Sequence, residues 1–499
     1  MSRGVVAAGH PLTAEAGADA LRNGGNAVDA AIAAMLASCV AEPMLTGLGA
    51  GGYMLVSPPE GREPVLLDFF VEAPGRGVDP DALGELEPVE VSFGDVNQVF
   101  NIGPASVGAY GTIAGVDEAA RRFGSMPLAR LAAPAARMAR EGVAVNAQQA
   151  YVLQILDPIA RSTPEAAAVF APGGGLLREG ETLRDPALAD ALERLGEEGA
   201  APFYTGEVAA AVVSWIGERG GALTLDDLSA YRVADREPVR ASYSGREVLL
   251  NPPPSAGGIL IAYALGRLER SAGPPTPREL VEVMEAAQGQ RTPDFLRGLA
   301  EEGFLERFLA QAARRAGRGC TTHISVLDEA GWACGVTCSN GSCSGVVVPG
   351  TGLHLNNMMG EQDLNPLGFH RHEPGRRMPS MMAPTVVLRD GRAELVLGSG
   401  GSNRIRSAIL QTIVNVLHRD MGAPAAVQAP RLHFEDGIVY VEPGIETAEI
   451  ERDGYQVARF GAPNLFFGGV HAVERIQADG TLSGGGDPRR GGAIAVASG

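Results

Sequence analysis

The residue with the clearest potential for chemistry in this 499-residue chain is a threonine that opens a strand-like segment. Thr321 follows Gly319 and Cys320 and begins the run Thr-Thr-His-Ile-Ser-Val. A threonine hydroxyl is a weak nucleophile without a base beside it, and a threonine at a chain terminus has a base in its own α-amine. The chain would then be cut before Thr321, whose hydroxyl can attack the preceding carbonyl. Taken alone, such a motif is more often purely structural.

The local patterns predict the elements that would position this residue. From Thr321 the apolar period changes from helical to alternating, which predicts a strand over 321–328, a turn, and a return strand over 333–338. Another hairpin is predicted over 385–388 and 393–397. A helix is predicted from Asn403 to about His418. The N-terminal part is mostly helical in pattern and the C-terminal part is rich in strands.

Composition excludes several classes of protein. Lys and Arg total 41 against 59 Asp and Glu, and a formal charge of −18 disfavours nucleic acid as a partner. No apolar run is long enough for a membrane span, and the start, MSRGVVAAGH, does not resemble a signal peptide. Five cysteines without an export signal favour reduced thiols and a cytoplasmic location.

Further motifs follow one another along the chain in an order that resembles a known family. They are Gly24-Gly25-Asn26-Ala27-Val28-Asp29-Ala30-Ala31, Gly49-Ala50-Gly51-Gly52-Tyr53-Met54-Leu55, Leu67-Asp68-Phe69, Pro252-Pro253-Pro254-Ser255-Ala256-Gly257-Gly258, Thr321-Thr322-His323, Leu355-Asn356-Asn357, Pro384-Thr385, Gly398-Ser399-Gly400-Gly401-Ser402 with Arg404-Ile405, and Asp487-Pro488-Arg489. Together they span nearly the whole chain and are similar to the motifs of γ-glutamyltransferases, which are N-terminal-nucleophile hydrolases.

The resemblance implies an α+β fold, the four-layer αββα sandwich. It implies a large-subunit-like segment, 1–320, and a small-subunit-like segment, 321–499, which remain together as a heterodimer after cleavage between Cys320 and Thr321. Thr321 would be the nucleophile and Ser339 would contact it. Backbone N–H groups near Gly401 and Ser402 would hold the oxyanion. No cofactor and no metal is implied.

The same resemblance indicates which residues would bind substrate, and here the chain departs from the family. Four polar positions are implied, namely Thr322, Asn340, Glu361 and Ser380. Phe70 stands where the family usually has an arginine that pairs with the α-carboxylate of a γ-glutamyl group. Glu361 replaces an aspartate that holds the α-amine, Met381 replaces the second serine of a pair, and Gly341 replaces an asparagine. The segment Leu364–Gly375 is shorter than the usual lid.

These departures leave the acyl group open. We expect a self-cleaving amide hydrolase or acyltransferase that acts on γ-glutamyl or related acyl amides and passes the acyl group to water or an amine. The alternatives are an acylase for a dicarboxylyl or more apolar amide, and a binding homologue that has lost catalysis.

Other chemistry-bearing residues have less specific patterns. Cys334, Cys338 and Cys343 lack the paired spacing of common zinc sites, so buried thiols are the simpler interpretation. His323 falls on the same strand face as Thr321, and we expect it to be packed and hydrogen-bonded rather than catalytic. Asp68 and Glu72 are expected to be structural carboxylates. Cys320 would become a C-terminus after cleavage and is a poor alternative nucleophile.

Overall fold

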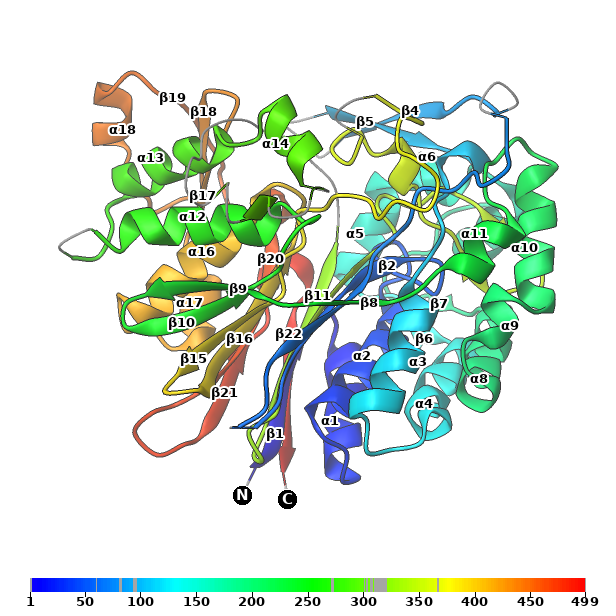
Figure 1. Cartoon of the computed structure of the whole chain (residues 1–499), viewed down its shortest axis with the longest axis horizontal. Coiled ribbons are helices and arrows are strands. Elements are labelled where there is room, and N and C mark those ends of the chain that lie inside the picture. Colours follow the sequence, from blue (N-terminus) through cyan, green and yellow to red (C-terminus); the bar gives the residue numbers. More distant parts are fainter. Residues whose placement is uncertain are drawn as a thin grey trace.

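Two antiparallel sheets packed face to face form the centre of the molecule, with helices on both outer sides (Figure 1). The computed structural model describes residues 2–59, 61–79, 83–92, 97–270, 273–299, 301, 304–305, 308, 321–365 and 368–498. The predicted four-layer αββα arrangement of an α+β protein is therefore confirmed.

The first sheet has seven strands and interleaves segments from both ends of the chain. Its order is β22 (Ala493–Ser498), β1 (Ser2–Ala8), β11 (Thr322–Asp328), β12 (Ala333–Ser339), β2 (Gly51–Ser57), β3 (Val65–Phe69) and β8 (Ala234–Arg236). The N-terminal strand β1 thus lies between two strands from beyond residue 320. The N- and C-termini lie side by side because β1 and β22 pair (Figure 1).

The second sheet has six strands and faces the first through contacts of β16 and β20 with β11. Its order is β21 (Leu482–Gly485), β20 (Gly469–Arg475), β16 (Arg392–Gly400), β15 (Thr385–Arg389), β10 (Arg246–Leu250) and β9 (Val239–Tyr243). In this sheet most strands come from beyond residue 320, and β9 and β10 complete it from the earlier part of the chain.

One helical layer covers the outer face of the first sheet. It is built on α1 (Pro11–Arg22), α2 (Ala27–Ala41), α3 (Thr112–Phe123) and α4 (Leu128–Glu141). Every residue of α2 is buried, and its N-terminus is closed by a capping box in which the Asn26 side chain accepts from the N–H groups of Val28 and Asp29. Further helices extend this layer: α5 (Ala147–Ile155), α6 (Asp157–Ala160), α7 (Pro164–Phe170), α8 (Pro186–Glu198), α9 (Ala201–Tyr204), α10 (Glu207–Gly217) and α11 (Leu225–Ala230).

The other helical layer covers the second sheet. It comprises α12 (Gly257–Leu268), α13 (Pro277–Gln288), α14 (Pro293–Gly298), α16 (Arg404–Leu417), α17 (Ala423–Gln428) and α18 (Ala448–Arg452). Beside it lies the small sheet of β17 (Leu432–Glu435), β18 (Ile438–Val441) and β19 (Gln456–Arg459). The remaining strands form short pairs: β4 (Glu87–Ser92) with β5 (Asn97–Ile102), β6 (Val143–Ala144) with β7 (Thr182–Leu183), and β13 (Val347–Val348) with β14 (Leu353–His354).

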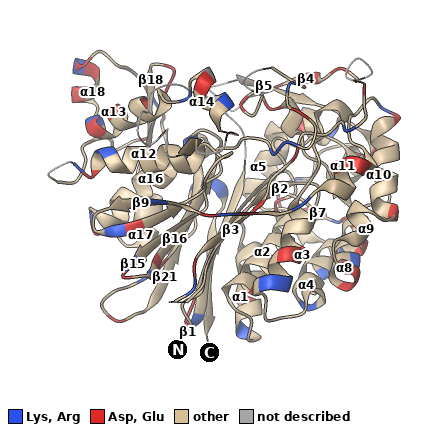
Figure 2. Cartoon of the chain, in the orientation of Figure 1, with Lys and Arg blue, Asp and Glu red and all other residues tan. Residues whose placement is uncertain are grey.

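Strand alternation divides the buried side chains between two cores. In β2, Met54 and Val56 pack toward the first helical layer, whereas Tyr53 and Leu55 belong to the core that includes the second sheet. This is the expected consequence of a side-chain period of two in a sheet that is covered on both faces. Charged residues gather on the outer helices, for example α13 and α18, and the central strands carry few (Figure 2).

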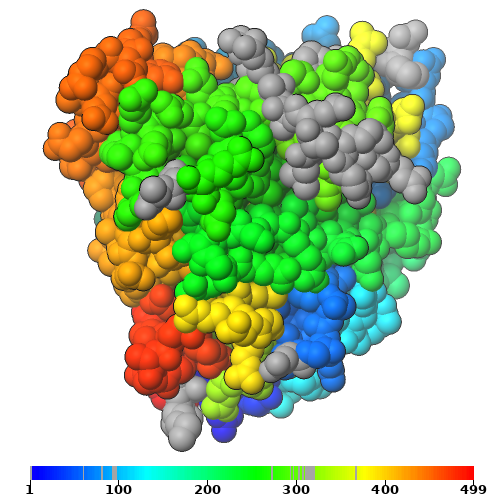
Figure 3. Space-filling view, turned by 60° about the vertical axis from the view of Figure 1, so that its left-hand side comes forward, coloured from blue at the N-terminus to red at the C-terminus, as the bar shows by residue number. Residues whose placement is uncertain are grey.

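The elements predicted near the site are confirmed with small shifts of their ends. The paired strands β11 and β12, the hairpin of β15 and β16, and helix α16 all occur where the patterns placed them. Within the described ranges, every helix is too short or too polar to cross a bilayer. In the space-filling view the green segment that contains α12 and α13 lies directly against orange segments from the C-terminal part (Figure 3).

Candidate active site

Thr321 lies immediately before β11, an interior strand of the first sheet, and only 4% of its surface is exposed. Its carbonyl oxygen accepts a hydrogen bond from Nη1 of Arg490 at 3.2 Å. A Cβ on Gly400 would lie 1.8 Å from the same oxygen, so only glycine lets β16 approach this closely. The backbone of Thr321 is thus held by the Arg490 side chain and lies directly against β16 of the second sheet. Cys320, the other side of the predicted cleavage site, lies outside the described residues.

The next residue, Thr322, points away from the pocket that Thr321 lines. Its hydroxyl donates to Oε2 of Glu42 at 2.9 Å, and the Thr13 hydroxyl donates to Oε1 at 2.8 Å. Burial raises the pKa of Glu42, and the two hydroxyl donors act in the opposite direction. This buried cluster joins α1 and the end of α2 to the start of β11. The predicted substrate contact of Thr322 has no support in this geometry, because its hydroxyl is held by Glu42.

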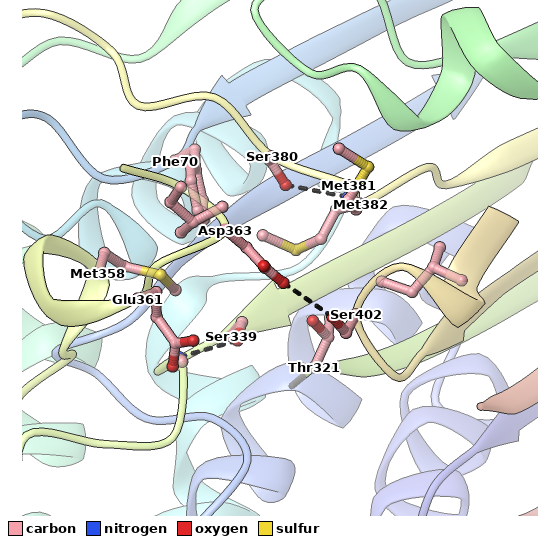
Figure 4. A pocket seen from close by; sticks show the side chains of 13 residues that line it. Phe70, Thr321, Ser339, Met358, Glu361, Asp363, Ser380, Met381, Met382 and Ser402 are labelled. Carbon is pink, nitrogen blue, oxygen red and sulfur yellow. Dashed lines mark hydrogen bonds between the residues drawn. The ribbon is translucent and has the colours of Figure 1, made fainter. Parts of the chain in front are cut away.

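A pocket adjoins Thr321 (Figure 4). Apolar side chains form much of its wall, and six residues supply hydroxyl or carboxyl groups. The described lining residues are Phe70, Thr321, Ser339, Gly341, Met358, Glu361, Asp363, Leu364, Ser380, Met381, Met382, Ser402 and Ile405. Six predicted site residues are therefore brought together from five separate segments: Phe70, Thr321, Ser339, Glu361, Ser380 and Ser402.

The turn between β16 and α16 lies beside Thr321. Gly401 has φ +115° and Ser402 has φ +66°, and their carbonyl groups accept from the N–H groups of Arg404 and Ile405. Neither the Gly401 N–H nor the Ser402 N–H donates to any residue that the structure describes. Two backbone donors without a partner among the described residues, next to a hydroxyl that lines the pocket, suit the binding of an oxyanion.

Two polar residues line the wall across from the turn. The Ser339 hydroxyl, at the end of β12, accepts from the Gly341 N–H at 2.9 Å. Oε1 of Glu361 accepts from the Ser342 N–H, also at 2.9 Å. Burial raises the pKa of Glu361, and the donors from Ser342 and Asn357 partly offset this effect. Ser380 is buried, and its hydroxyl accepts from the Met382 N–H at 2.9 Å.

Phe70 is 1% exposed and stacks on Tyr53, with ring centroids 5.5 Å apart. The nearest arginines by sequence or packing are engaged elsewhere: Arg76 pairs with Asp227 at 3.2 Å. Arg377 donates to the carbonyl of Phe70 behind the ring and pairs with Asp68 at 3.3 Å. Neither lines the pocket, and among the described lining residues there is no Lys, Arg or His.

Asp363 is the site residue that sequence reasoning missed. Its Oδ2 accepts from the Ser402 hydroxyl at 3.2 Å, across the pocket (Figure 4). Burial raises its pKa well above the ordinary range, and the neighbouring Glu361 adds to the shift. Its position two residues after Glu361 was the only available signal. The short segment that follows Glu361 thus still reaches over the pocket through Asp363 and Leu364.

The remaining sequence predictions fall in other places. The Asn340 amide donates to the carbonyl of His354 at 3.2 Å and does not line the pocket. Cys334, Cys338 and Cys343 are buried in the core, as expected for core thiols. Among the described residues, no group of three or more His, Cys, Asp or Glu side chains is arranged to hold a metal ion.

His323 is packed between the two sheets, as predicted. Its Nδ1 lies 2.8 Å from the Thr337 hydroxyl and its Nε2 lies 2.8 Å from the Ser325 hydroxyl. Burial lowers its pKa well below the usual value, so the ring is neutral. Both nitrogens have partners, and the ring does not line the pocket. Asp68 likewise is structural, since it pairs with Arg236 at 2.8 Å.

The αββα sandwich, with a threonine at the start of a central strand and a donor-rich turn beside it, defines a hydrolase of the N-terminal-nucleophile type. The sequence model of γ-glutamyltranspeptidase matches residues 13–497. The chain belongs to the γ-glutamyltranspeptidase family and is therefore an enzyme.

Similar proteins include both acylases and glutathione hydrolases. An acylase ACY 1 proenzyme of Pseudomonas sp. (strain V22) is 32% identical, with 97% of this chain and 91% of the relative covered. The glutathione hydrolase proenzyme of Escherichia coli (strain K12) is 30% identical over 98% of this chain and 90% of the relative. The structure of cephalosporin acylase from Bacillus halodurans superposes with a TM-score of 0.84 at 26% identity, covering 99% of this chain and 96% of that one.

Proposed function

We propose that the chain cleaves itself before Thr321 and that the new N-terminal threonine is the nucleophile of an amidase. The position of Thr321 supports this: it opens β11, lines the pocket and lies beside the turn of Gly401 and Ser402. The two products of cleavage, 1–320 and 321–499, are proposed to remain together as one enzyme.

The proposed mechanism uses groups of this chain throughout. The free α-amine of Thr321 takes the proton of the Thr321 hydroxyl, whose Oγ attacks the substrate carbonyl carbon. The N–H groups of Gly401 and Ser402 stabilise the oxyanion of the tetrahedral intermediate. The C–N bond breaks, the leaving amine takes the proton, and an ester to Thr321 remains. Water or a second amine then attacks that ester and regenerates the hydroxyl.

We further propose that the preferred acyl group is apolar and carries no carboxylate. The observation behind this proposal is Phe70, whose ring stacks on Tyr53 at the position of the family's carboxylate-pairing arginine. The described pocket wall offers two carboxyl groups, Glu361 and Asp363, and no cation. An anionic acyl group would be desolvated there without a partner, which costs binding free energy.

A γ-glutamyl group remains the second candidate because of Glu361. Its buried carboxyl group lines the pocket and can hold an ammonium group such as the α-amine of glutamate. The glutathione hydrolases among the relatives are consistent with this candidate. It would require the α-carboxylate to bind without the arginine, and would be expected to give a high KM.

The nucleophile is tested by Thr321→Ala. The purified wild-type protein should give two bands in denaturing electrophoresis, and the variant should give one band and no amidase activity. A variant that still matures and hydrolyses amides would show that Thr321 is not the nucleophile. A wild-type chain that stays in one piece and turns over no amide would instead favour the binding homologue.

The acyl group is tested with a panel of p-nitroanilides that share one leaving group. Hexanoyl p-nitroanilide should be cleaved with a higher kcat/KM than the glutaryl and γ-glutamyl compounds. Phe70→Arg should move the preference toward the two carboxylate-bearing compounds, because it adds a partner for the carboxylate. A wild-type preference for γ-glutamyl p-nitroanilide would overturn the proposal of an apolar acyl group.

A further inference from the structure

A buried polar cluster lies next to the turn of Gly401 and Ser402 and is formed by residues that do not themselves line the pocket. Its centre is Asn403, which is fully buried and is the residue between Ser402 and helix α16. The Asn403 Oδ1 accepts from Nη1 of Arg291 at 3.1 Å. The Asn403 Nδ2 donates to Oε1 of Glu435 at 2.6 Å. Both halves of this amide are therefore held by side chains from two other elements, which also settles its orientation.

The two partners belong to different elements and are themselves buried. Arg291 follows the end of α13 and is 3% exposed, and Glu435 is the last residue of β17 and is 1% exposed. Burial lowers the pKa of Arg291 to about 10, while the nearby carboxyl groups of Asp363 and Glu435 oppose this shift. The guanidinium is still charged at neutral pH, so the hydrogen bond from Arg291 to Asn403 involves an ion and belongs to the stronger class of hydrogen bond.

The backbone of the turn needs such support. Ser402 has φ +66°, a left-handed conformation that is unfavourable for an L-residue and persists only where its surroundings maintain it. The Ser402 side chain is held from the pocket side by Asp363. Asn403, the next residue, is held by Glu435 at the end of β17 and by Arg291 just after α13. A displacement of the turn would move two N–H donors away from the oxyanion.

We propose that Asn403 is a positioning residue that, through Arg291 and Glu435, fixes the N–H groups of Gly401 and Ser402 for catalysis. This inference rests on the proposed role of that turn as the oxyanion site. Asn403 itself does not line the pocket and would not touch substrate. Its contribution is therefore made in the transition state, where charge develops on the oxyanion, and should be nearly absent from substrate binding.

A mutant cycle of Asn403 and Glu435 tests the proposal. Asn403→Asp keeps the size and the acceptor for Arg291 but replaces the donor toward Glu435 with a second carboxyl group. We expect a fall in kcat of about 10- to 100-fold with KM nearly unchanged, measured per mature enzyme with the p-nitroanilide that the wild type cleaves fastest. Adding Glu435→Gln restores a donor opposite the new acceptor, and the double variant should recover most of the lost kcat.

Thr412→Ala is the matched control, because it removes a buried hydrogen bond from the Thr412 hydroxyl to the Ala408 carbonyl in the same helix without touching the turn. It should lower the melting temperature and leave kcat unchanged. The proposal is overturned if Asn403→Asp keeps wild-type kcat, if KM rises instead, or if the double variant is no better than Asn403→Asp. If Asn403→Asp does not cleave itself, the proposal is supported when the double variant cleaves itself and recovers kcat. It is overturned when the double variant also fails to cleave itself. If Thr321→Ala is inactive while Asn403→Asp keeps wild-type kcat, the proposed nucleophile holds and only the role of Asn403 is wrong.

Discussion

At the scale of single residues, the pocket combines apolar side chains with two carboxyl groups. Phe70 and Met381 present apolar surface in the pocket that Thr321 lines, whereas Glu361 and Asp363 place two carboxyl groups there. Because burial raises the pKa of both carboxyl groups, they change charge at a higher pH than ordinary side chains. The electrostatic character of the pocket should therefore depend on pH over a range in which exposed carboxylates remain ionised.

This gives a prediction for Asp363. Below its raised pKa the group is neutral, and as pH rises through that pKa the pocket gains a negative charge. The KM of glutaryl p-nitroanilide should therefore increase with rising pH, and the KM of the hexanoyl compound should change little. Asp363→Asn keeps an acceptor for the Ser402 hydroxyl and should weaken the pH dependence. Steady-state kinetics between pH 5 and pH 8 measures both, and parallel profiles for the two compounds would contradict the prediction.

At the scale of elements, glycines in β16 let the two sheets meet around the site. A Cβ on Gly398 would lie 2.4 Å from two ring atoms of His323. That ring cannot move aside easily, because hydroxyls of Thr337 and Ser325 hold both of its nitrogens. The close approach of β16 to β11 thus depends on the absence of a side chain at this position, and so does the placement of the turn that follows β16.

Gly398→Ala should therefore destabilise the protein. We expect a loss of about 1–3 kcal/mol from overpacking, together with slower self-cleavage, because β16 is pushed away from Thr321. Urea unfolding of the uncleaved Thr321→Ala background measures the stability without interference from cleavage. Gly266→Ala is the control: a Cβ there meets no atom within 4 Å, and in the exposed part of α12 it should stabilise slightly. Equal effects of the two substitutions would refute the packing argument.

The helices and strands near the site could be predicted from the sequence better than the pairing of distant strands and the contacts of distant side chains. The period change at Thr321, the hairpin around Asp390 and the apolar face of helix α16 are local patterns, and the structure confirms all three. Pairing between distant segments, such as β1 with β22, has no local signal. The same is true of side chains whose role depends on such pairing. Asp363 reaches Ser402 only because two segments 39 residues apart converge, and the Thr322 hydroxyl turns to Glu42 from 280 residues away.

At the scale of the whole molecule, the proposed cut leaves two interleaved fragments rather than two domains. Strand β1 pairs with β11 on one side and β22 on the other, and β10 pairs with β15 in the second sheet. Separating the fragments would expose both cores and break ladders in both sheets. Under native conditions the fragments should stay together, held by the same contacts that stabilise the fold.

Size-exclusion chromatography tests this expectation. The cleaved wild type and uncleaved Thr321→Ala should elute at the same volume, and the wild-type peak should contain both fragments when it is analysed by denaturing electrophoresis. Fragments that elute separately, or a cleaved protein that elutes much earlier than the uncleaved one, would contradict the shared-core arrangement.

The position of β1 between two strands from the other fragment also affects how the protein folds before and after cleavage. Before cleavage, folding is a first-order event within one chain, whose rate does not depend on concentration. After cleavage, a denatured molecule must find its partner again, and each fragment alone leaves apolar surface and unpaired strand edges open to aggregation. Before cleavage, the stability of the chain would be set by a reversible folding equilibrium. After cleavage, the lifetime of the folded enzyme would instead be set by its rate of unfolding. The enzyme would be made once, from the intact chain, and its lifetime would be set kinetically.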